Sequence, residues 1–520
     1  MLLKSGIIVS FMTFLSRILG LVRDVVIAQF MGAGAGADVF FFANKIPNFL
    51  RRLFSEGAFA QAFIPVLTEV QANNDKAEFK QFIAKVSGTL GVIVFLTTVL
   101  GVVGSSVIAA IFGTGWFIAY LNDEPAGDKY LLASTMLKIT FPYLFFVTLV
   151  GLSGAILNTL NKFAVSSFTP VILNIVIIIC AVILHNDFST PAFALAWGVF
   201  IGGVVQLVFQ IPFLLKVGAL VRPQWGWHDP NVKKVRTLMI PALFGVSVSQ
   251  INLLVDTLIA SFLMTGSISW LYYSDRLMEF PLGLFGIAIA TIILPALSKD
   301  HIAQDKLRFQ ANMNWAIKMV CVLGIPSAIG LIVLAEPLLS LIFERGAFTA
   351  SDVSMASMSL IAYASGLFSF MLIKVLAPGF FAQQDTKTPV KIGIIAMVAN
   401  MGFNVIFAIP YGFVGLAIAT ALSATLNAGL LYYHLHQRDM YRLSLATLLL
   451  CMRVVVSSLI MGGVLMYVQA NIVWSELTFV LRLSLVVQWL ILAAVVYFVS
   501  LKVFGVTLSA IRSPPNGEIK

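Results

Sequence analysis

The chain has 520 residues, of which 59% are hydrophobic and only 11% are charged. Soluble domains carry about 25% charged residues, so this composition excludes an ordinary soluble protein and indicates an integral membrane protein. The net charge of +10 could suggest nucleic-acid binding. However, the lysines and arginines are concentrated in alternate loops between apolar segments, which is the positive-inside pattern of a multi-pass protein. We therefore expect membrane lipids as surroundings and no nucleic-acid partner.

Apolar segments of membrane-spanning length recur along the whole chain. A helix needs roughly 20 apolar residues to cross a bilayer, and none of these segments alternates with the period of two that a barrel strand requires. The sequence thus predicts an all-α integral membrane protein with about fourteen transmembrane helices and, because that number is even, with both termini in the cytoplasm. The segments lie near residues 6–30, 37–69, 82–113, 130–160, 168–185, 191–216, 234–264, 268–297, 309–335, 354–383, 389–409, 412–436, 446–469 and 478–504.

The first predicted helix carries three charges within the bilayer, Arg17, Arg23 and Asp24. At about 100° per residue, Arg17, Gly20 and Asp24 share one face and Arg23 lies on its flank. The segment is longer than the apolar part of a signal peptide and lacks a clear cleavage site. We expect an uncleaved anchor helix.

The second predicted helix, at 37–69, is the most charged segment of spanning length. Its phenylalanines alternate with a stripe of polar side chains on one helical face. A charge at the centre of a bilayer costs several kcal/mol unless it faces protein or water. This stripe therefore predicts a polar cavity inside a helix bundle. Its members are Asp38, Lys45, Arg52 and Glu56, with Asn48 beside them and Arg51 next to Arg52.

The chain also repeats itself. Ala37–Phe54 aligns with Ile268–Phe285, and the match resumes with Pro65–Glu69 against Pro295–Lys299, so the spacing is close to 230 residues. Parallel six-helix repeats are a transporter architecture in which the substrate site lies between the halves. The predicted domains are two six-helix lobes and a pair of extra helices, at 1–220, 230–437 and 446–504.

Further polar residues lie in the second half. Asp275, Arg276 and Glu279 lie in the predicted helix 268–297, and Lys374 precedes a proline within another span. We interpret Lys374 as a cavity residue. Candidate ion-coupling residues are Asp256, Asn400 and Asn404. Arg453 and Arg482 lie near helix ends, where arginines commonly extend towards the interface.

The charges of the first, second and eighth predicted helices favour an anionic substrate. Mutual pairing is the alternative explanation, but buried ion pairs add little net stability compared with apolar side chains. Arginine is well suited to phosphate because its planar guanidinium donates two parallel hydrogen bonds. We find no nucleotide-binding loop, dinucleotide fingerprint or nucleophile triad. The sequence therefore predicts a transporter rather than an enzyme, with no cofactor.

Four segments carry a resemblance to a known family: MTFLSRILGLVRD, GAGADVFFFANKIPNFLRRLFSEGAFAQAFIP, YYSDRLMEFPLGLFGIAIATIILP and KVLAPGFFAQQDTKTPVK. They resemble the MurJ (MviN) family of lipid II flippases. The resemblance implies a MATE-like fold, transport of lipid II from the inner to the outer leaflet of the cytoplasmic membrane, and a groove for the lipid tail on the last two helices. It implies site roles for Ser16, Arg17, Arg23, Asp24, Asp38, Asn48, Arg51, Arg52, Arg276 and Glu279.

One departure concerns ion coupling. Some members of the family bind Na⁺ through carboxylates of the seventh and eleventh helices. In this chain the seventh predicted helix has the carboxylate Asp256, but the eleventh has the amides Asn400 and Asn404 in place of a carboxylate. We therefore expect no confident metal site. Three alternatives stay open at this point: a flippase of polysaccharide units on a polyprenyl pyrophosphate, a multidrug antiporter and a non-transporting scaffold. Enzymes of peptidoglycan synthesis are candidate partners.

Overall fold

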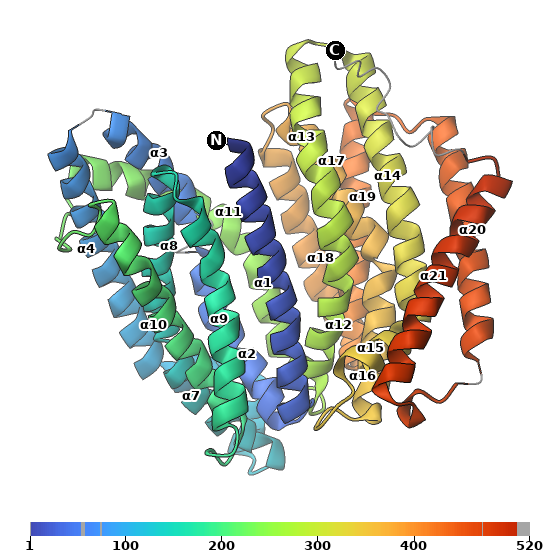
Figure 1. Cartoon of the computed structure of the whole chain (residues 1–520), viewed down its shortest axis with the longest axis horizontal. Coiled ribbons are helices and arrows are strands. Elements are labelled where there is room, and N and C mark those ends of the chain that lie inside the picture. Colours follow the sequence, from blue (N-terminus) through green and yellow to red (C-terminus); the bar gives the residue numbers. More distant parts are fainter. Residues whose placement is uncertain (1, 54–57, 73–74, 471, 507–520) are drawn as a thin grey trace. The chain divides into compact units, whose positions relative to one another are not determined.

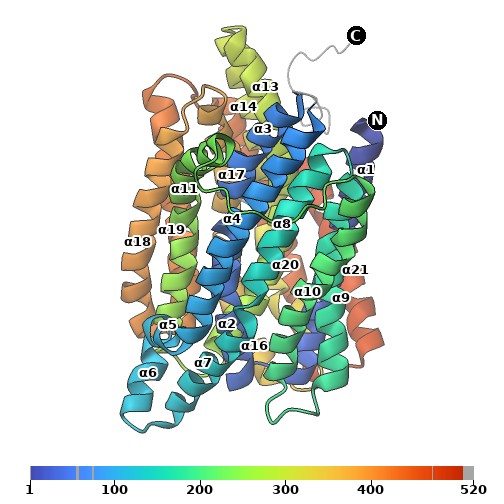
Figure 2. The same cartoon turned by 90° about the vertical axis from the view of Figure 1, so that its left-hand side faces the viewer.

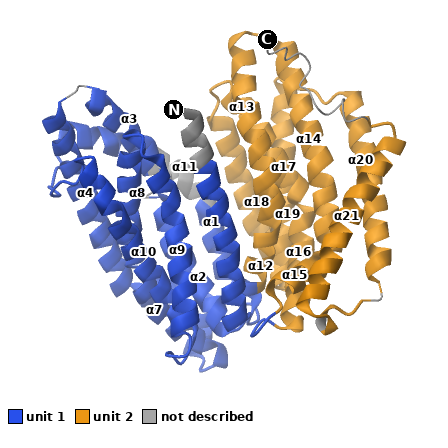
Figure 3. Ribbon diagram, viewed as in Figure 1, with its two compact units in different colours: residues 1–269, 345–348 blue, residues 270–344, 349–520 orange. Residues whose placement is uncertain are grey.

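A computed structural model describes residues 2–53, 58–72, 75–470 and 472–506 (Figure 1). The described part of the chain is helical and contains no strand, apart from an isolated bridge between Arg345 and Phe348. This confirms the all-α prediction. The chain forms two compact units, one of residues 1–269 and 345–348 and one of residues 270–344 and 349–520 (Figure 3).

The first unit contains eleven of the α-helices that lie in the described residues. In Figure 2, α4, α8, α9 and α10 run beside one another and form one wall of this unit. The helices are α1 (Leu2–Met31), α2 (Ala35–Arg51), α3 (Ala58–Ala72), α4 (Lys76–Val103), α5 (Ser105–Phe112), α6 (Thr114–Leu121), η2 (Pro125–Gly127), α7 (Asp128–Thr140), α8 (Tyr143–Thr159), α9 (Phe163–Leu184), α10 (Ala192–Lys216) and α11 (Pro230–Ala260).

The second unit begins within α12, whose first residues belong to the first unit. Its described helices are α12 (Ser267–Pro281), η3 (Leu282–Gly286), α13 (Ile287–Ile302), α14 (Lys306–Val333), α15 (Ala335–Phe343), α16 (Ala350–Ser365), α17 (Leu367–Phe381), α18 (Lys387–Tyr411), α19 (Phe413–Gln437), α20 (Leu445–Gln469), η4 (Trp474–Glu476) and α21 (Phe479–Val503).

Ten helical stretches within the described residues are long and apolar enough to cross a membrane. One of them, Lys387–Gln437, joins α18 and α19, each of which is 25 residues long. The charged helices α1, α2 and α11 are not among the ten. The count of fourteen spans therefore stays a prediction.

Widened helical turns occur at two positions that the sequence repeat pairs. A π-helical turn at Leu282–Gly286 separates α12 from α13. The backbone of Arg52–Leu53 has the same form at the end of α2. Such turns are rare and are often found near functional sites. Both of them follow the charged segments that the sequence analysis singled out.

The helix α11 packs against α3 and belongs to the first unit, whereas the predicted second lobe begins at 230. The loop before α11 crosses α4, because the backbone nitrogen of Gln224 donates to the carbonyl of Ala84 at 2.8 Å. A Cβ at Gly88 would lie 2.1 Å from the Gln224 carbonyl oxygen, so the crossing requires glycine. The lobes defined by the repeat stay a prediction, and the compact units are a separate division of the chain.

The last two helices share an apolar core with the rest of the second unit. Val454, Leu465 and Trp489 are buried there against Val322 of α14. The prediction that Arg482 extends to the interface is wrong: this side chain is buried and its guanidinium lies 3.0 Å from the carboxylate of Glu344. The carboxylate supplies a partner inside the protein, so the arginine need not reach water.

Candidate functional site

A compact polar cluster lies on α1. The guanidinium of Arg23 donates through Nε and Nη2 to one carboxylate oxygen of Asp24, at 3.0 and 2.7 Å. Its Nη1 donates to the side-chain oxygen of Asn174 on α9 at 3.0 Å, and the Asn174 amide donates to the carbonyl of Ser16 at 3.2 Å. Asp24 is 2% exposed. The buried carboxylate and the α9 amide together fix the orientation of the Arg23 fork.

Arg17 lies on the same helix in a different environment. Its side chain is exposed. No hydrogen bond or ion pair joins it to another residue within the described ranges. A cation of this kind has its donors available for a ligand.

Asp38 belongs to α2 and is 1% exposed. Its side chain packs against the first residues of α12. Its carboxylate accepts hydrogen bonds from the backbone nitrogens of Gly266 and Ser269, at 2.7 and 3.0 Å, and from the Ser269 hydroxyl at 2.7 Å. The Nζ atom of Lys129 lies 3.8 Å from it. A carboxylate at the positive end of a helix is electrostatically favourable. Asp38 therefore joins α2 to the first turn of the helix that carries Arg276.

Two further members of the α2 stripe contact α11. Lys45 donates to the hydroxyl of Thr257 at 3.2 Å, and Arg52 donates to the side-chain oxygen of Gln250 at 2.8 Å. Lys45 and Arg52 are two helical turns apart, and so are Thr257 and Gln250 in the opposite direction. Lys45 and Arg52 thus contact one face of α11, and α2 and α11 run antiparallel there. Arg52 remains exposed at its end.

Two further α2 residues are joined within their own helix. The Nε of Arg51 donates to the side-chain oxygen of Asn48 at 3.0 Å, and the Asn48 amide donates to the carbonyl of Asn44 at 2.9 Å. Glu56, the last member of the predicted stripe, lies outside the described residues.

A second polar cluster lies on α12 in the second unit. Arg276 donates to the carboxylate of Glu279 at 3.0 Å and to the hydroxyl of Tyr272 at 3.1 Å, and its guanidinium carbon is 4.8 Å from the Tyr272 ring centroid. Asp275 is half-buried on the same helix. Lys374 on α17 is exposed, and it has no hydrogen-bond or ion-pair partner in the described part of the chain.

The candidate ion-coupling residues lie in different units. Asp256 on α11 accepts a 3.4 Å hydrogen bond from Asn252. Asn404 donates to Asn400 at 3.0 Å, and both amides are buried in α18. Within the described ranges, no group of three or more His, Cys, Asp and Glu residues is placed to hold a metal ion. The ion-coupling role stays an untested prediction.

The candidate residues include two buried carboxylates and three exposed cations. Asp24 and Asp38 are buried and accept hydrogen bonds inside the first unit. Arg17, Arg52 and Lys374 are exposed. Such positions allow the cations to bind an anion, while the two carboxylates orient helices and side chains.

Several partners of these charges are not predicted from the sequence. One of them is Lys129, which lies in α7 against Asp38. Asn174 is the one amide in α9, and an amide in an otherwise apolar span was the signal that could have identified it. The remaining residues that the sequence analysis did not single out are Gln250, Thr257 and Ser269.

The chain as a whole is similar to known proteins. A family described as "Lipid II flippase MurJ" matches residues 27–487. A probable lipid II flippase MurJ of Vibrio cholerae is 63% identical over 466 residues, which cover 90% of this chain and 89% of that protein. Its counterpart in Haemophilus influenzae is 57% identical over 502 residues, which cover 95% and 98%.

Solved structures are also similar to this chain. A lipid II flippase MurJ in an inward closed conformation matches with a TM-score of 0.78 and 29% identity, covering 96% of this chain and 98% of that one. An inward-facing multidrug resistance MATE family transporter of the MOP superfamily matches with a TM-score of 0.65 and 13% identity, covering 84% and 98%. The second likeness shows a shared fold only, and it confirms the predicted MATE-like architecture.

Proposed function

The chain belongs to the MurJ family of lipid II flippases, and we propose that it moves lipid II from the inner to the outer leaflet of the cytoplasmic membrane for cell-wall synthesis. Family membership is the observation that carries the proposal. Lipid II joins a peptide-bearing disaccharide to an undecaprenyl tail through a pyrophosphate. The chain transports this lipid by alternating access and forms no covalent bond to it. Both termini face the cytoplasm.

The physical task is to shield the charged headgroup from hydrocarbon. A phosphate in the bilayer centre costs many kcal/mol unless cations and polar groups replace its water. Arg17, Arg23 and Arg52 in the first unit, and Arg276 in the second, supply guanidinium groups of the required kind. Lys374, which is exposed, supplies an ammonium group in the second unit.

The acidic residues position these cations. Asp24 holds Arg23 by two hydrogen bonds to one oxygen, and Glu279 holds Arg276. Asp38 fixes the start of α12 through Gly266 and Ser269. We propose that these acids and cations exchange partners as access changes from one side of the membrane to the other. Enzymes that make lipid II before flipping, or polymerise it afterwards, are the candidate partners.

Arg17 gives the cleanest test of the cationic site. Because it has no partner within the described residues, Arg17→Ala should leave the thermal unfolding temperature unchanged and should lower lipid II flipping by tenfold or more. Flipping is measured in cells depleted of their own flippase, as the lipid II that an added lipid II-cleaving enzyme can reach from outside. Arg276→Ala tests the second unit in the same assay.

Two comparisons sharpen this test. Arg23→Lys keeps the charge but loses the two-pronged donor, so it should retain less flipping than wild type if the fork matters. Lys233→Ala removes an exposed lysine of α11 outside these clusters and should flip normally. Full flipping by Arg17→Ala, Arg23→Ala and Arg276→Ala would contradict the proposed role of the arginines.

A further inference from the structure

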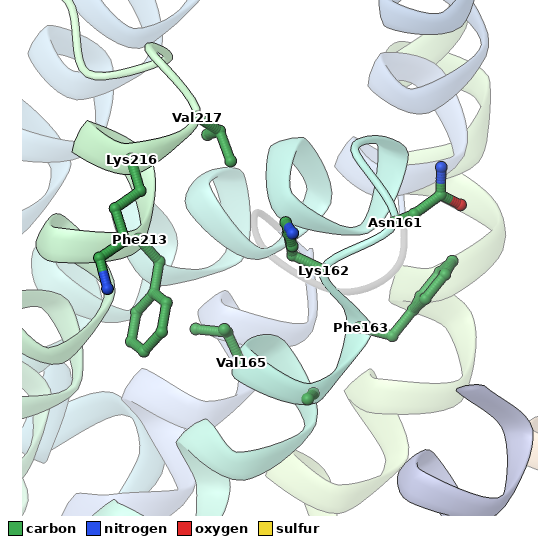
Figure 4. Close-up of a pocket in the computed structure, with 8 residues that line it drawn as sticks. Asn161, Lys162, Phe163, Val165, Phe213, Lys216 and Val217 are labelled. Carbon is green, nitrogen blue, oxygen red and sulfur yellow. The ribbon is translucent and has the colours of Figure 1, made fainter. Parts of the chain in front are cut away.

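A pocket of about 490 Å³ lies in the first unit, where α8 turns into α9 and α10 ends. Figure 4 shows Lys162 on the turn before α9, and Lys216 with Phe213 on the last turn of α10. The arginine clusters described above contribute nothing to its lining. The lining residues are Asn161, Lys162, Phe163, Ala164, Val165, Phe213, Lys216 and Val217.

The charge of this lining is positive. Both lysine side chains are exposed, and neither is joined to a carboxylate within the described ranges. The Nζ of Lys216 lies 5.9 Å from the ring centroid of Phe213. No acidic residue lines the pocket in the described part of the chain. Among the described residues, the pocket therefore presents two ammonium groups and no carboxylate.

The first turn of α9 adds to this positive character. The helix has 22 residues and begins at Phe163, and the Lys162 side chain makes no cap for it. The first backbone N–H groups of a helix have no partner within that helix, and they attract anions together with its dipole. Phe163 and Ala164, which begin α9, both line the pocket. Two lysines and a helix start thus converge on one cavity.

The position of the pocket indicates the source of an anion. Phe163–Leu184 and Ala192–Lys216 are both apolar enough to span a membrane, and the two helices pack against each other. Lys162 directly precedes the first span and Lys216 ends the second. Both ammonium groups therefore lie at the same hydrocarbon boundary, where phospholipid phosphates are found. Val165, Phe213 and Val217 provide an apolar side to the pocket.

We infer that this pocket is a binding site for the phosphate group of an anionic membrane phospholipid, separate from the residues proposed to bind lipid II. Lys162 and Lys216 bind the phosphate. The N–H groups of Phe163 and Ala164 donate to it, whereas the N–H of Val165 donates to the Lys162 carbonyl at 3.3 Å. The apolar side contacts the glycerol and the first acyl carbons. The site lies in the cytoplasmic leaflet if the proposed orientation holds. Its existence depends neither on that orientation nor on flipping.

The test uses the purified full chain in nanodiscs of phosphatidylethanolamine with a small fraction of spin-labelled phosphatidylglycerol. Electron paramagnetic resonance measures the immobilised fraction of the labelled lipid and hence its affinity relative to spin-labelled phosphatidylcholine. A lysine near the membrane surface contributes about 1 kcal/mol towards an anionic lipid. Lys162→Gln and Lys216→Gln should each lower the relative affinity roughly fivefold, and the double variant should lower it further.

Matched variants exclude trivial explanations. Lys162→Arg and Lys216→Arg should retain the preference for phosphatidylglycerol, and Lys233→Gln, an exposed lysine elsewhere in the first unit, should not change it. All variants should unfold at the wild-type temperature, since both pocket lysines are exposed and neither makes a hydrogen bond or an ion pair within the described ranges. Equal affinities in wild type and the double variant would overturn the site.

A second arm distinguishes a lipid from soluble phosphate. Inorganic phosphate is titrated into the detergent-purified protein while an amine-reactive reagent labels Lys162 and Lys216, read by mass spectrometry. We expect phosphatidylglycerol to protect both lysines and millimolar phosphate to protect neither. Protection by phosphate, without any preference for the anionic lipid in nanodiscs, would overturn the lipid as the source.

Discussion

The geometry around Arg23 shows how a buried acid can prepare a cation for a ligand. Asp24 and Asn174 together accept three hydrogen bonds from the guanidinium, so its plane is set before any substrate arrives. An arginine fixed in this way loses less side-chain entropy on binding phosphate than a mobile one. Arg17 lies two turns earlier without such support within the described residues. The two arginines are therefore expected to differ: Arg23 orients the substrate, and Arg17 adds charge.

Asp38 has a structural role that can be measured apart from transport. Asp38→Asn should lower the free energy of unfolding by about 3 kcal/mol. The substitution removes the carboxylate charge beside the buried Lys129, and it places an amide against the N–H donors of Gly266 and Ser269. The measurement is thermal unfolding of the purified protein. The pair Asp38→Asn with Lys129→Met should lose less than the sum of the single variants. Additive losses would contradict the pairing.

Charges within apolar spans are costly and therefore conspicuous, so the sequence alone singles out these residues as candidates, and their role in a site stays a prediction. The sequence did not predict their partners. Asn174 is 151 positions from Arg23, and Thr257 is 212 positions from Lys45. Contacts at such separations depend on how helices pack, and a single sequence does not encode this in any local pattern.

Among the helices, the antiparallel match of α2 with α11 explains the period of the charged stripe. Lys45 and Arg52 repeat at two turns and meet Thr257 and Gln250 at the same repeat. The sequence showed the stripe but indicated a cavity for all of it. The structure assigns part of the stripe to a helix contact within the first unit, and leaves Arg52 exposed.

The packing of α20 against α14 makes a prediction that is independent of function. The sulfur atoms of Cys321 and Cys451 lie 2.6 Å apart, so a mild oxidant should join them in one chain. Mass spectrometry of the digested protein should show the linked peptides and the loss of two hydrogens. Cys451→Ser should abolish the link, and Cys180→Ser should leave it. Failure to form the link in folded protein would contradict this packing.

The loop before α11 is held by a charge pair whose pH dependence follows from its pKa. Asp229 is partly desolvated, which alone raises its pKa, but the hydrogen bond from Lys85 at 2.7 Å and two backbone N–H donors lower the pKa below its ordinary value. A lowered pKa stabilises the folded state above the ordinary carboxyl range, and this contribution is lost as the pH falls through the lower folded value.

Asp229→Asn keeps the side-chain oxygen that caps α11 and removes the charge. We expect the unfolding temperature at pH 7 to fall by roughly 2 °C relative to wild type. The difference should shrink as the pH is lowered below about 4. A difference that is constant from pH 7 to pH 3 would show that the charge pair with Lys85 does not act on stability.

At the scale of the whole molecule, composition was sufficient to predict an all-helical membrane protein, and the motifs were sufficient to predict the family. The domain limits were harder to read. The helix α11 follows the repeat boundary in sequence yet packs in the first unit, and the short segment 345–348 returns to it through the hydrogen bond from Ala347 to Gln29. Repeats record the order of helices along the chain, whereas compact units depend on which helices pack together.

The proposed transport is tested by complementation of a cell depleted of its own lipid II flippase. Lipid II on the outer leaflet is quantified for cells expressing the wild-type chain or Arg17→Ala at equal membrane levels. We expect the wild type to restore lipid II exposure and growth, and Arg17→Ala to restore less than a tenth of the exposure. Failure of well-expressed wild type would contradict the proposed substrate. Equal rescue by both would contradict the role of Arg17.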